Sequence, residues 1–186
     1  VCFIIINDYT TKDKKLGVGP LNDGYLIGLE HYHLGCKIFY LHNSKINEFQ
    51  ILLQFFMNNT TNQLTIFYTG RDDGSENIEF NNGILSKKYI EKVISSNCNG
   101  KLKIILITDT CGTGSVFDIR RCKNTVSFFV NKLKSDQSKE HQLSHGIFTY
   151  YLCKFIKENE KGITPNDLVK KINSSINKSS IVGRFI

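Results

Sequence analysis

An aspartate and a cysteine two residues apart follow a short apolar run at residues 104–107. The run stops at Asp109 and Cys111, and Gly112-Thr113-Gly114 then forces a turn. A short continuous apolar run is typical of a strand buried on both faces, and open α/β sheets place their sites at the carboxyl ends of such strands. Cys111 would present a nucleophilic thiol there, with the Asp109 carboxylate on the same side of the strand. The alternative is that Cys111 is only a small buried hydrophobic residue.

Two other polar segments are predicted to lie at the same edge of the sheet. Thr69-Gly70-Arg71 follows the apolar run at 64–68, and Asn22-Asp23 stands at the expected start of a helix after a first strand at 2–6. Because parallel strands end at one edge, these segments and Asp109-Thr110-Cys111 would ring a single rim.

The periodicity of apolar residues predicts strands that alternate with helices along the chain. Strands are expected at 2–6, 36–41, 64–68, 104–107 and 125–130, with a hairpin or irregular excursion at 78–85 and a strand or frayed end at 181–186. A first helix is expected to start at Asn22-Asp23 and to stop at Gly35, and a second is expected to follow a cap at Ser44. Ser86 is expected to cap a third helix at 87–95. Two further helices are expected at 147–156 and at 163–176, the last of them opened by Thr164-Pro165. Residues 131–144 are expected to form a surface loop. The order predicts one domain, 1–186, of the α/β class, with a mostly parallel central sheet flanked by helices on both faces.

Composition narrows the classes of function. The chain has 186 residues, a net charge of +7 and 40% hydrophobic residues, which is typical of a soluble globular domain. We expect no membrane segment and no signal peptide, because no apolar stretch is long enough and the chain opens with a core strand. The basic residues form only isolated pairs without a known binding module, so nucleic acid is not an expected partner.

The six cysteines also indicate the compartment. No two form a C-x-x-C pair, and several fall in predicted core elements, so we expect reduced thiols in a cytoplasmic protein and no zinc site.

Two interpretations of the cysteine loop fail on spacing. A phosphate-binding cysteine loop of the phosphatase type needs an arginine six residues after the cysteine, where this chain has Phe117. A nucleotide cradle at Gly112-Thr113-Gly114-Ser115 lacks both the G-x-G-x-x-G and the Walker patterns, and no long helix is predicted after the turn.

A third interpretation rests on a resemblance that runs through nearly the whole chain in order. The sequence resembles metacaspases and their bacterial caspase-like relatives, within the caspase-type cysteine peptidases. The strongest match is Asp109-Thr110-Cys111-Gly112-Thr113-Gly114-Ser115-Val116-Phe117-Asp118. The others are Ile5-Ile6-Asn7-Asp8-Tyr9 with Leu21-Asn22-Asp23, Phe67-Tyr68-Thr69-Gly70, Ser135-Asp136-Gln137, His145-Gly146-Ile147-Phe148-Thr149-Tyr150-Tyr151-Leu152 and Thr164-Pro165-Asn166-Asp167-Leu168.

The resemblance implies a caspase-like sandwich and assigns roles to residues. Cys111 takes the nucleophile position, while Asp23, Thr69 and Asp109 take the positions of a substrate pocket that accepts a basic side chain. Two carboxylates suit such a pocket because they can bind arginine or lysine. Asp23 could instead be a helix cap.

The catalytic histidine position of the family is occupied by Arg71. A histidine there takes and returns a proton during acyl transfer, and a permanently protonated arginine can do neither. We therefore expect a non-catalytic pseudopeptidase that binds basic peptide segments, or a partner such as a related active peptidase. The alternative is an active cysteine endopeptidase that cleaves after arginine or lysine with an unrecognised base.

Other residues of the family's chemistry are missing or badly placed. His31, His33 and His42 belong to early elements, His141 lies in a charged segment, and His145 matches a family histidine outside the catalytic pair. The calcium ligands of metacaspases include the counterpart of Asp118 and an acidic pair, and Lys87 and Lys88 take the place of that pair. Because two ammonium groups repel a hard dication, we expect no calcium site and no cofactor.

Overall fold

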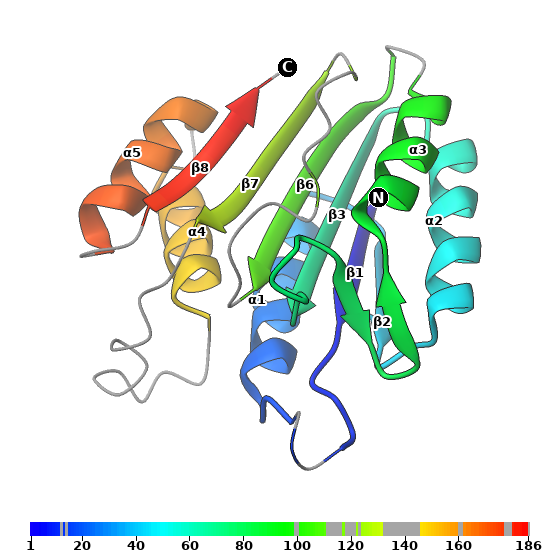
Figure 1. Ribbon diagram of the computed structural model, residues 1–186. Coiled ribbons are helices and arrows are strands. Elements are labelled where there is room, and N and C mark those ends of the chain that lie inside the picture. Colours follow the sequence, from blue (N-terminus) through cyan, green and yellow to red (C-terminus); the bar gives the residue numbers. More distant parts are fainter. Residues whose placement is uncertain are drawn as a thin grey trace.

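The computed structural model describes residues 1–11, 13, 15–98, 101–110, 117, 122, 124–131, 146–159, 162–176 and 180–185, with the backbone alone at 130–131 and 180–185 (Figure 1). Six of the strands form one sheet in the order β2-β1-β3-β6-β7-β8. Strands β2, β1, β3, β6 and β7 run parallel, and β8 pairs antiparallel with β7. The bounds are β1 Cys2–Ile6, β2 Ile38–His42, β3 Gln63–Gly70, β6 Lys103–Thr110, β7 Thr125–Asn131 and β8 Ser180–Phe185; β4 Ile78–Phe80 and β5 Gly83–Leu85 form a separate hairpin.

Helices cover both faces of this sheet (Figure 1). On one face, α2 and α3 pack with the hairpin, and on the other α1, α4 and α5 pack against β1, β3, β6 and β7. The bounds are α1 Gly19–His33, α2 Ile46–Asn59, α3 Lys87–Asn97, α4 Ile147–Glu158 and α5 Pro165–Ser175. The predicted α/β class with a mostly parallel sheet between helix layers is therefore confirmed.

The two helix layers explain why the central strands read as continuous apolar runs. In β1, Phe3 and Ile5 point into the α2–α3 layer, whereas Ile4 and Ile6 point into the α1–α4–α5 layer. Successive side chains of a strand alternate between faces, so a strand covered twice needs apolar residues at every position.

Several boundaries differ from the sequence-based expectation. Helix α1 begins at Gly19 rather than at Asn22-Asp23, because Pro20 lies in the first turn, where its fixed φ angle suits a helix. Asp23 therefore lies inside α1 and is not its cap. Strand β3 continues through Gly70, so Thr69 belongs to the strand and not to a loop.

The expected Ser44 cap of α2 is wrong. The N-cap residue is Lys45, whose backbone N–H donates to the Glu48 carboxylate at 2.8 Å. Ser44 is buried, and its hydroxyl has no hydrogen-bond partner among the described residues. The predicted caps of α3 and α5 are confirmed, with Ser86 Oγ accepting from the Lys88 N–H and Thr164 Oγ1 from the Asp167 N–H.

Three further predictions concern the hairpin, the C-terminal segment and the loop after β7. The hairpin at 78–85 is confirmed, and the C-terminal segment at 180–185 is a strand. Of the expected surface loop at 131–144, Asn131 belongs to β7 and the rest lies outside the described residues. In the part of the chain that the structure describes, no helix combines the length and apolarity needed to cross a bilayer.

The capping pattern predicts different costs for three alanine substitutions. Ser86→Ala and Thr164→Ala each remove an acceptor for a helix N–H and should lower the free energy of unfolding by about 1 kcal/mol. Ser44→Ala removes no cap and should change it by less than about 0.5 kcal/mol. Urea unfolding followed by circular dichroism measures all three, and an equal loss for Ser44→Ala would contradict the assigned start of α2.

Candidate functional site

Three polar residues that are far apart in sequence meet at the carboxyl ends of β3 and β6. Thr69 and Asp109 are register partners in the parallel pairing of these two strands, and Asp23 reaches them from α1. Thr69 Oγ1 donates a hydrogen bond to Asp23 Oδ2 at 3.4 Å. The structure thus brings together all three residues predicted to line a basic-residue pocket, and their role in binding stays a prediction.

The first turn of α4 sits directly on the two carboxylates. The Gly146 N–H donates to Asp23 Oδ1 at 2.7 Å, and Thr149 donates to Asp109 Oδ2 through its N–H at 3.1 Å and its hydroxyl at 2.6 Å. Gly146 is the N-cap of α4 and has no side chain to cap the helix itself. The aspartates therefore act as a cap supplied from elsewhere in the chain, and the partial positive charge of the helix N-terminus stabilises their ionised forms.

Gly146 permits this close approach. A Cβ atom at this position would lie 2.2 Å from Asp109 Oδ2 and 2.9 Å from Asp23 Oδ2, closer than non-bonded atoms come. Both carboxylates are thus within 3 Å of one point, and only glycine lets the helix begin so near to them.

Burial and mutual repulsion make this an unusual acidic pair. Asp23 is 3% exposed, and desolvation, followed by the charge of Asp109, raises its pKa to about 8. Desolvation also raises the pKa of Asp109, against the hydrogen bonds from Thr149 that favour its ionised form. Two buried carboxylates this close do not both ionise readily, so the pair retains a proton at neutral pH.

Arg71 follows the last residue of β3, and two buried tyrosines hold its backbone. Its N–H donates to the Tyr9 hydroxyl at 2.7 Å, and its carbonyl accepts from the Tyr68 hydroxyl at 2.7 Å. Tyr9 has a φ of 61°, a strained value for an aromatic residue, and its N–H donates to Asn43 Oδ1 at 3.1 Å. These contacts fix the main chain at Arg71, where the resemblance to metacaspases predicts a histidine, independently of the side chain that the position carries.

The predicted nucleophile lies outside the described residues. Cys111 and the turn Gly112-Thr113-Gly114 belong to that part, as do Asp118, His141 and His145. Between Thr110 and Asn124 the structure describes only Phe117 and Cys122, both fully buried in the α2–α3 layer. The nucleophile role of Cys111 therefore stays a prediction that rests on the sequence.

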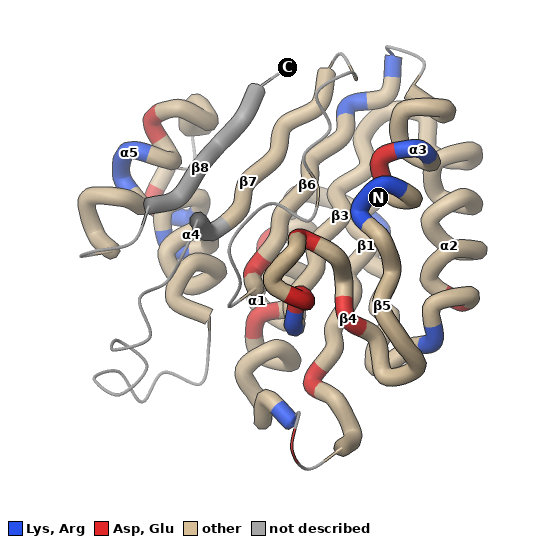
Figure 2. The backbone as a smooth tube through the Cα atoms, viewed as in Figure 1, with Lys and Arg blue, Asp and Glu red and all other residues tan. Residues whose placement is uncertain are grey.

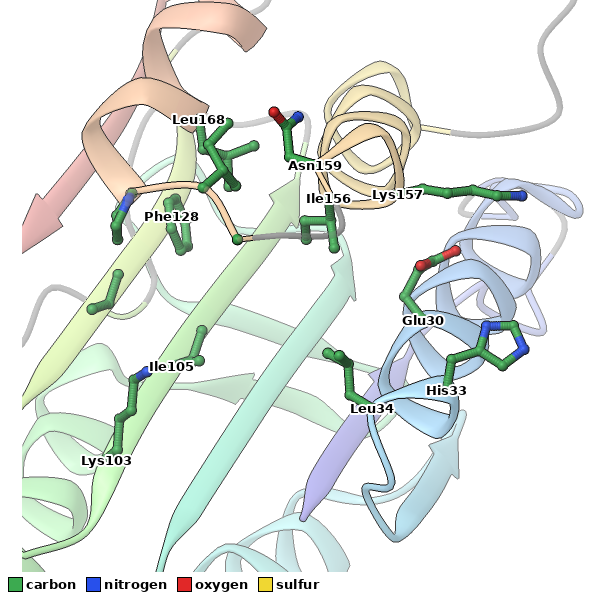
Figure 3. Close-up of a pocket in the computed structure, with 14 residues that line it drawn as sticks. Glu30, His33, Leu34, Lys103, Ile105, Phe128, Ile156, Lys157, Asn159 and Leu168 are labelled. Carbon is green, nitrogen blue, oxygen red and sulfur yellow. The ribbon is translucent and has the colours of Figure 1, made fainter.

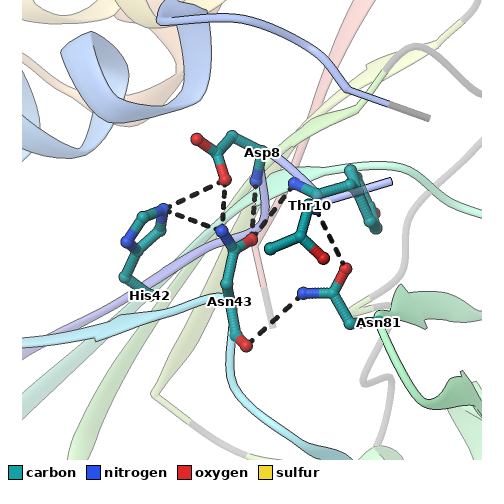
Figure 4. A network of polar contacts seen from close by, with 6 residues as sticks. Asp8, Thr10, His42, Asn43 and Asn81 are labelled. Atoms are coloured by element: carbon teal, nitrogen blue, oxygen red, sulfur yellow. Dashed lines mark hydrogen bonds and ion pairs between the residues drawn. The ribbon is translucent and has the colours of Figure 1, made fainter. Parts of the chain in front are cut away.

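The described histidines lie away from the end of β6, the strand that precedes the predicted nucleophile. His42 ends β2, which β1 and β3 separate from β6 by roughly 14 Å of sheet. It belongs instead to a polar network in which its Nε2 lies 3.1 Å from Asp8 Oδ1 (Figure 4). In the same network Asn43 Nδ2 donates to Asp8 Oδ1, and Asn43 Oδ1 accepts from the Asp8 N–H at 3.1 Å. This network joins the ends of β1 and β2 and has a structural role.

His31 and His33 are equally unsuited to act as the base. His31 is buried in α1 with its Nδ1 2.9 Å from the Ile27 carbonyl, and burial lowers its pKa. It lies eight residues beyond Asp23, about 12 Å along the helix. His33 is farther still, at the last turn of α1.

Charge placement sets the acidic site apart from the basic surface. In Figure 2, acidic positions gather near α1, the end of β6 and the segment before β4, with a basic position among them, and other lysines and arginines lie on the helices and at the start of β6. At the start of α3, Lys87 forms an ion pair with Glu76.

Among the described residues no group of three or more His, Cys, Asp or Glu side chains could hold a metal. The expectation of no calcium site stays a prediction, because Asp118 is not among these residues.

A cavity that the sequence did not predict lies on the α1–α4–α5 face, at the opposite end of the sheet from the acidic pair (Figure 3). Its volume is about 670 Å³. The walls are mainly apolar, including Ile105, Phe128 and Ile156, and Lys103 and Lys157 stand at its rim. Lys103 begins β6 and Asp109 nearly ends it, so roughly 20 Å separate this cavity from the acidic pair.

The chain was also compared with known proteins. No protein-family model matches it, and no curated protein is similar to it in sequence. Fold and site together define an α/β protein whose five-stranded parallel sheet ends in a buried acidic pair under a helix N-terminus.

The raised pKa of Asp23 predicts a pH-dependent stability. An unfolded aspartate ionises near its ordinary pKa of 3.8, whereas folded Asp23 keeps its proton up to about pH 8. The native state thus binds more protons than the unfolded state between these values, and the free energy of unfolding falls as pH rises through that window. Asp23→Asn keeps the acceptor for the Gly146 N–H and removes the ionisation, so the variant should be less sensitive to pH and more stable than the parent at pH 8.5.

Urea unfolding between pH 4 and pH 9 measures this difference, with Asp13→Asn as the control at an exposed aspartate. The control should follow the profile of the parent protein. Parallel profiles for Asp23→Asn and the parent would show that Asp23 ionises normally.

Proposed function

We propose that this chain is a caspase/metacaspase-like domain whose cysteine–histidine dyad is degenerate and which binds basic peptide segments without cleaving them. The observation that carries the proposal is the convergence of Asp23, Thr69 and Asp109 at the carboxyl edge of the sheet. The resemblance to metacaspases assigns the same three residues to a pocket for arginine or lysine. The parallel order β2-β1-β3-β6-β7, closed by an antiparallel β8, agrees with the caspase-like sandwich that the resemblance implies.

The electrostatics of the pair favour a cationic ligand. Asp23 and Asp109 are both buried, and burial raises the pKa of each carboxyl. A guanidinium or ammonium group nearby would stabilise the ionised forms and displace the retained proton. When both carboxylates ionise, they repel each other. A cation bound between them would remove this repulsion, and the relief adds to the free energy of binding.

The arginine at the position that the resemblance assigns to the base supports binding rather than cleavage. An arginine side chain cannot accept the thiol proton or return one to a leaving amine, so Arg71 cannot serve as the base. Of the described histidines, His31, His33 and His42 lie on α1 or at the edge strand β2. Loss of the base in a comparable catalytic unit lowers turnover by about 10⁶-fold.

The proposed partners are proteins with an exposed arginine or lysine in an extended segment, and a related active peptidase is one such partner. The net charge of +7 repels basic ligands at long range, so recognition relies on short-range contacts at the acidic pair.

Peptide binding provides the direct test. A peptide that ends in arginine should bind at least about 10-fold more tightly than its alanine analogue, and the ratio should increase from pH 6.5 to pH 8.5 as the pair ionises. Asp109→Asn should abolish the preference, while Asp13→Asn should leave it unchanged. Calorimetry in buffers of different ionisation enthalpy should show proton release on binding. Equal affinity for both peptides would exclude the pocket.

Thiol chemistry separates reactivity from turnover. A guanidinium near a thiol favours the thiolate, so Cys111 should be alkylated by iodoacetamide at neutral pH. Cys2 and Cys153 serve as internal references, because burial raises the pKa of each to about 12. Mass spectrometry of the labelled peptides should show Cys111 reacting first, while peptide substrates stay intact.

Arg71→His should then restore measurable cleavage after basic residues, because the main chain at this position is held by Tyr9 and Tyr68 whatever side chain it carries. Robust cleavage by the unmodified chain, abolished by Cys111→Ala, would overturn the proposal and favour the active endopeptidase.

A further inference from the structure

Exposed apolar side chains are concentrated at one edge of the described structure. The structure describes ten exposed large hydrophobic residues, and nine of them belong to α1 with its flanking residues, β2 or α2. The exception is Ile84 on β5. Eight of the nine are Val18, Leu21, Tyr25, Tyr32, Phe39, Tyr40, Ile51 and Phe55, whereas the ninth, Leu34, lines the cavity of Figure 3. Isolated exposed apolar residues are ordinary, but a set confined to one edge indicates an interface.

Strand β2 is the centre of this edge. It pairs with β1 on one side, and none of the described strands pairs with its other side. Its sequence, Ile38-Phe39-Tyr40-Leu41-His42, contains no lysine, acidic residue or proline, the residues that usually protect an open edge from pairing. Phe39 and Tyr40 are 42% and 52% exposed and point to opposite faces of the sheet.

The exposed residues of the helices continue from these two side chains. On α1, Leu21, Tyr25 and Tyr32 share one stripe, since they recur at helical spacing. The Tyr40 hydroxyl lies against Gly28 of the same helix, where an added Cβ would be 1.9 Å away. The stripe of α1 therefore borders Tyr40.

On the opposite face of the sheet, a row of phenylalanine rings extends from β2 onto α2. The Phe39 and Phe56 rings are 4.8 Å apart, and the Phe56 and Phe55 rings are 5.5 Å apart. Phe56 is buried, whereas Phe55 is 53% exposed on α2. Apolar surface thus extends from β2 over one helix on each side of the sheet.

We propose that β2 pairs antiparallel with β2 of a second copy of this chain, which joins the two sheets and packs α1 and α2 against their counterparts. A two-fold axis at Tyr40 pairs Tyr40 with itself, Phe39 with Leu41 and Ile38 with His42. In this register Lys37 falls opposite Asn43, and Lys45 opposite Gly35. No lysine faces a lysine, so the edge is complementary to itself.

The area is sufficient for a specific dimer. An aromatic side chain buries on the order of 150–250 Å², so five that are about half exposed offer roughly 100 Å² each. These are Tyr25, Tyr32, Phe39, Tyr40 and Phe55. The two copies together supply about 1,000 Å², which is what a biological interface needs. A second copy covers β2 and both flanking helices at once, because it presents the same three elements.

Sedimentation equilibrium over a concentration series tests the proposal. The parent protein should dimerise in the micromolar range, and added salt should strengthen the dimer because it screens the repulsion between two chains of charge +7. Tyr25→Lys and Phe55→Lys should each raise the dissociation constant at least about 10-fold, since the symmetry introduces each lysine twice. Amide hydrogen exchange of Ile38–His42 should slow as the protein concentration rises.

The matched control is Ile84→Lys, which places the same charge at a residue that is 56% exposed outside this edge. It should leave the dimer intact, and thermal unfolding of all three variants checks that they fold. A parent protein that stays monomeric at every concentration would overturn the proposal. Binding of an added strand-forming peptide to β2 would not change that conclusion, because the proposed partner is a second copy of the chain. Equal weakening by Ile84→Lys would also overturn it.

Discussion

Two carboxylates buried under the first turn of a helix are the constraint on which this structure depends. Asp23 and Asp109 accept the N–H groups of Gly146 and Thr149 that α4 cannot satisfy itself. Each aspartate is costly to bury, and their mutual repulsion increases the cost. The helix N-terminus and a retained proton together offset that cost, and so α4 is attached to the ends of the central strands.

This arrangement reduces stability in a way that is typical of functional sites. A pair of asparagines would cap α4 without the repulsion, and the fold gains nothing in stability from keeping two acids together. Groups whose pKa values are displaced by burial and by a like charge occur preferentially where ligands bind. The structural role of the pair is compatible with the recognition role that we propose, because a bound cation would relieve the same repulsion that the retained proton relieves.

Helix α1 connects the two proposed surfaces. Asp23 lies on its buried side, next to Thr69, while Leu21, Tyr25 and Tyr32 form a stripe that is largely exposed. Asp23 lies between Leu21 and Tyr25 in sequence but is buried, so a dimer through β2 would leave the side chains of the acidic site out of the interface. The site and the edge are thus separate surfaces that share one rigid element.

The sequence by itself determined the order of strands and helices, the caps at Ser86 and Thr164, and the edge of the sheet at which polar residues collect. Those features follow from local periodicity and from the geometry of parallel strands, which require no knowledge of distant contacts. The start of α1 and the cap of α2 were misjudged, because Pro20 and Glu48 competed with the local signals of Asn22-Asp23 and Ser44.

Only the tertiary structure decided what surrounds those residues. It showed that Asp23 and Asp109 cap a helix whose N-cap residue, Gly146, lies 123 and 37 positions later in the chain, and that burial shifts their pKa values upward. It also showed that aromatic residues of α1, β2 and α2 remain uncovered. Desolvation, repulsion and exposure depend on which segments fold over one another, and no local pattern along the chain encodes these long-range neighbours.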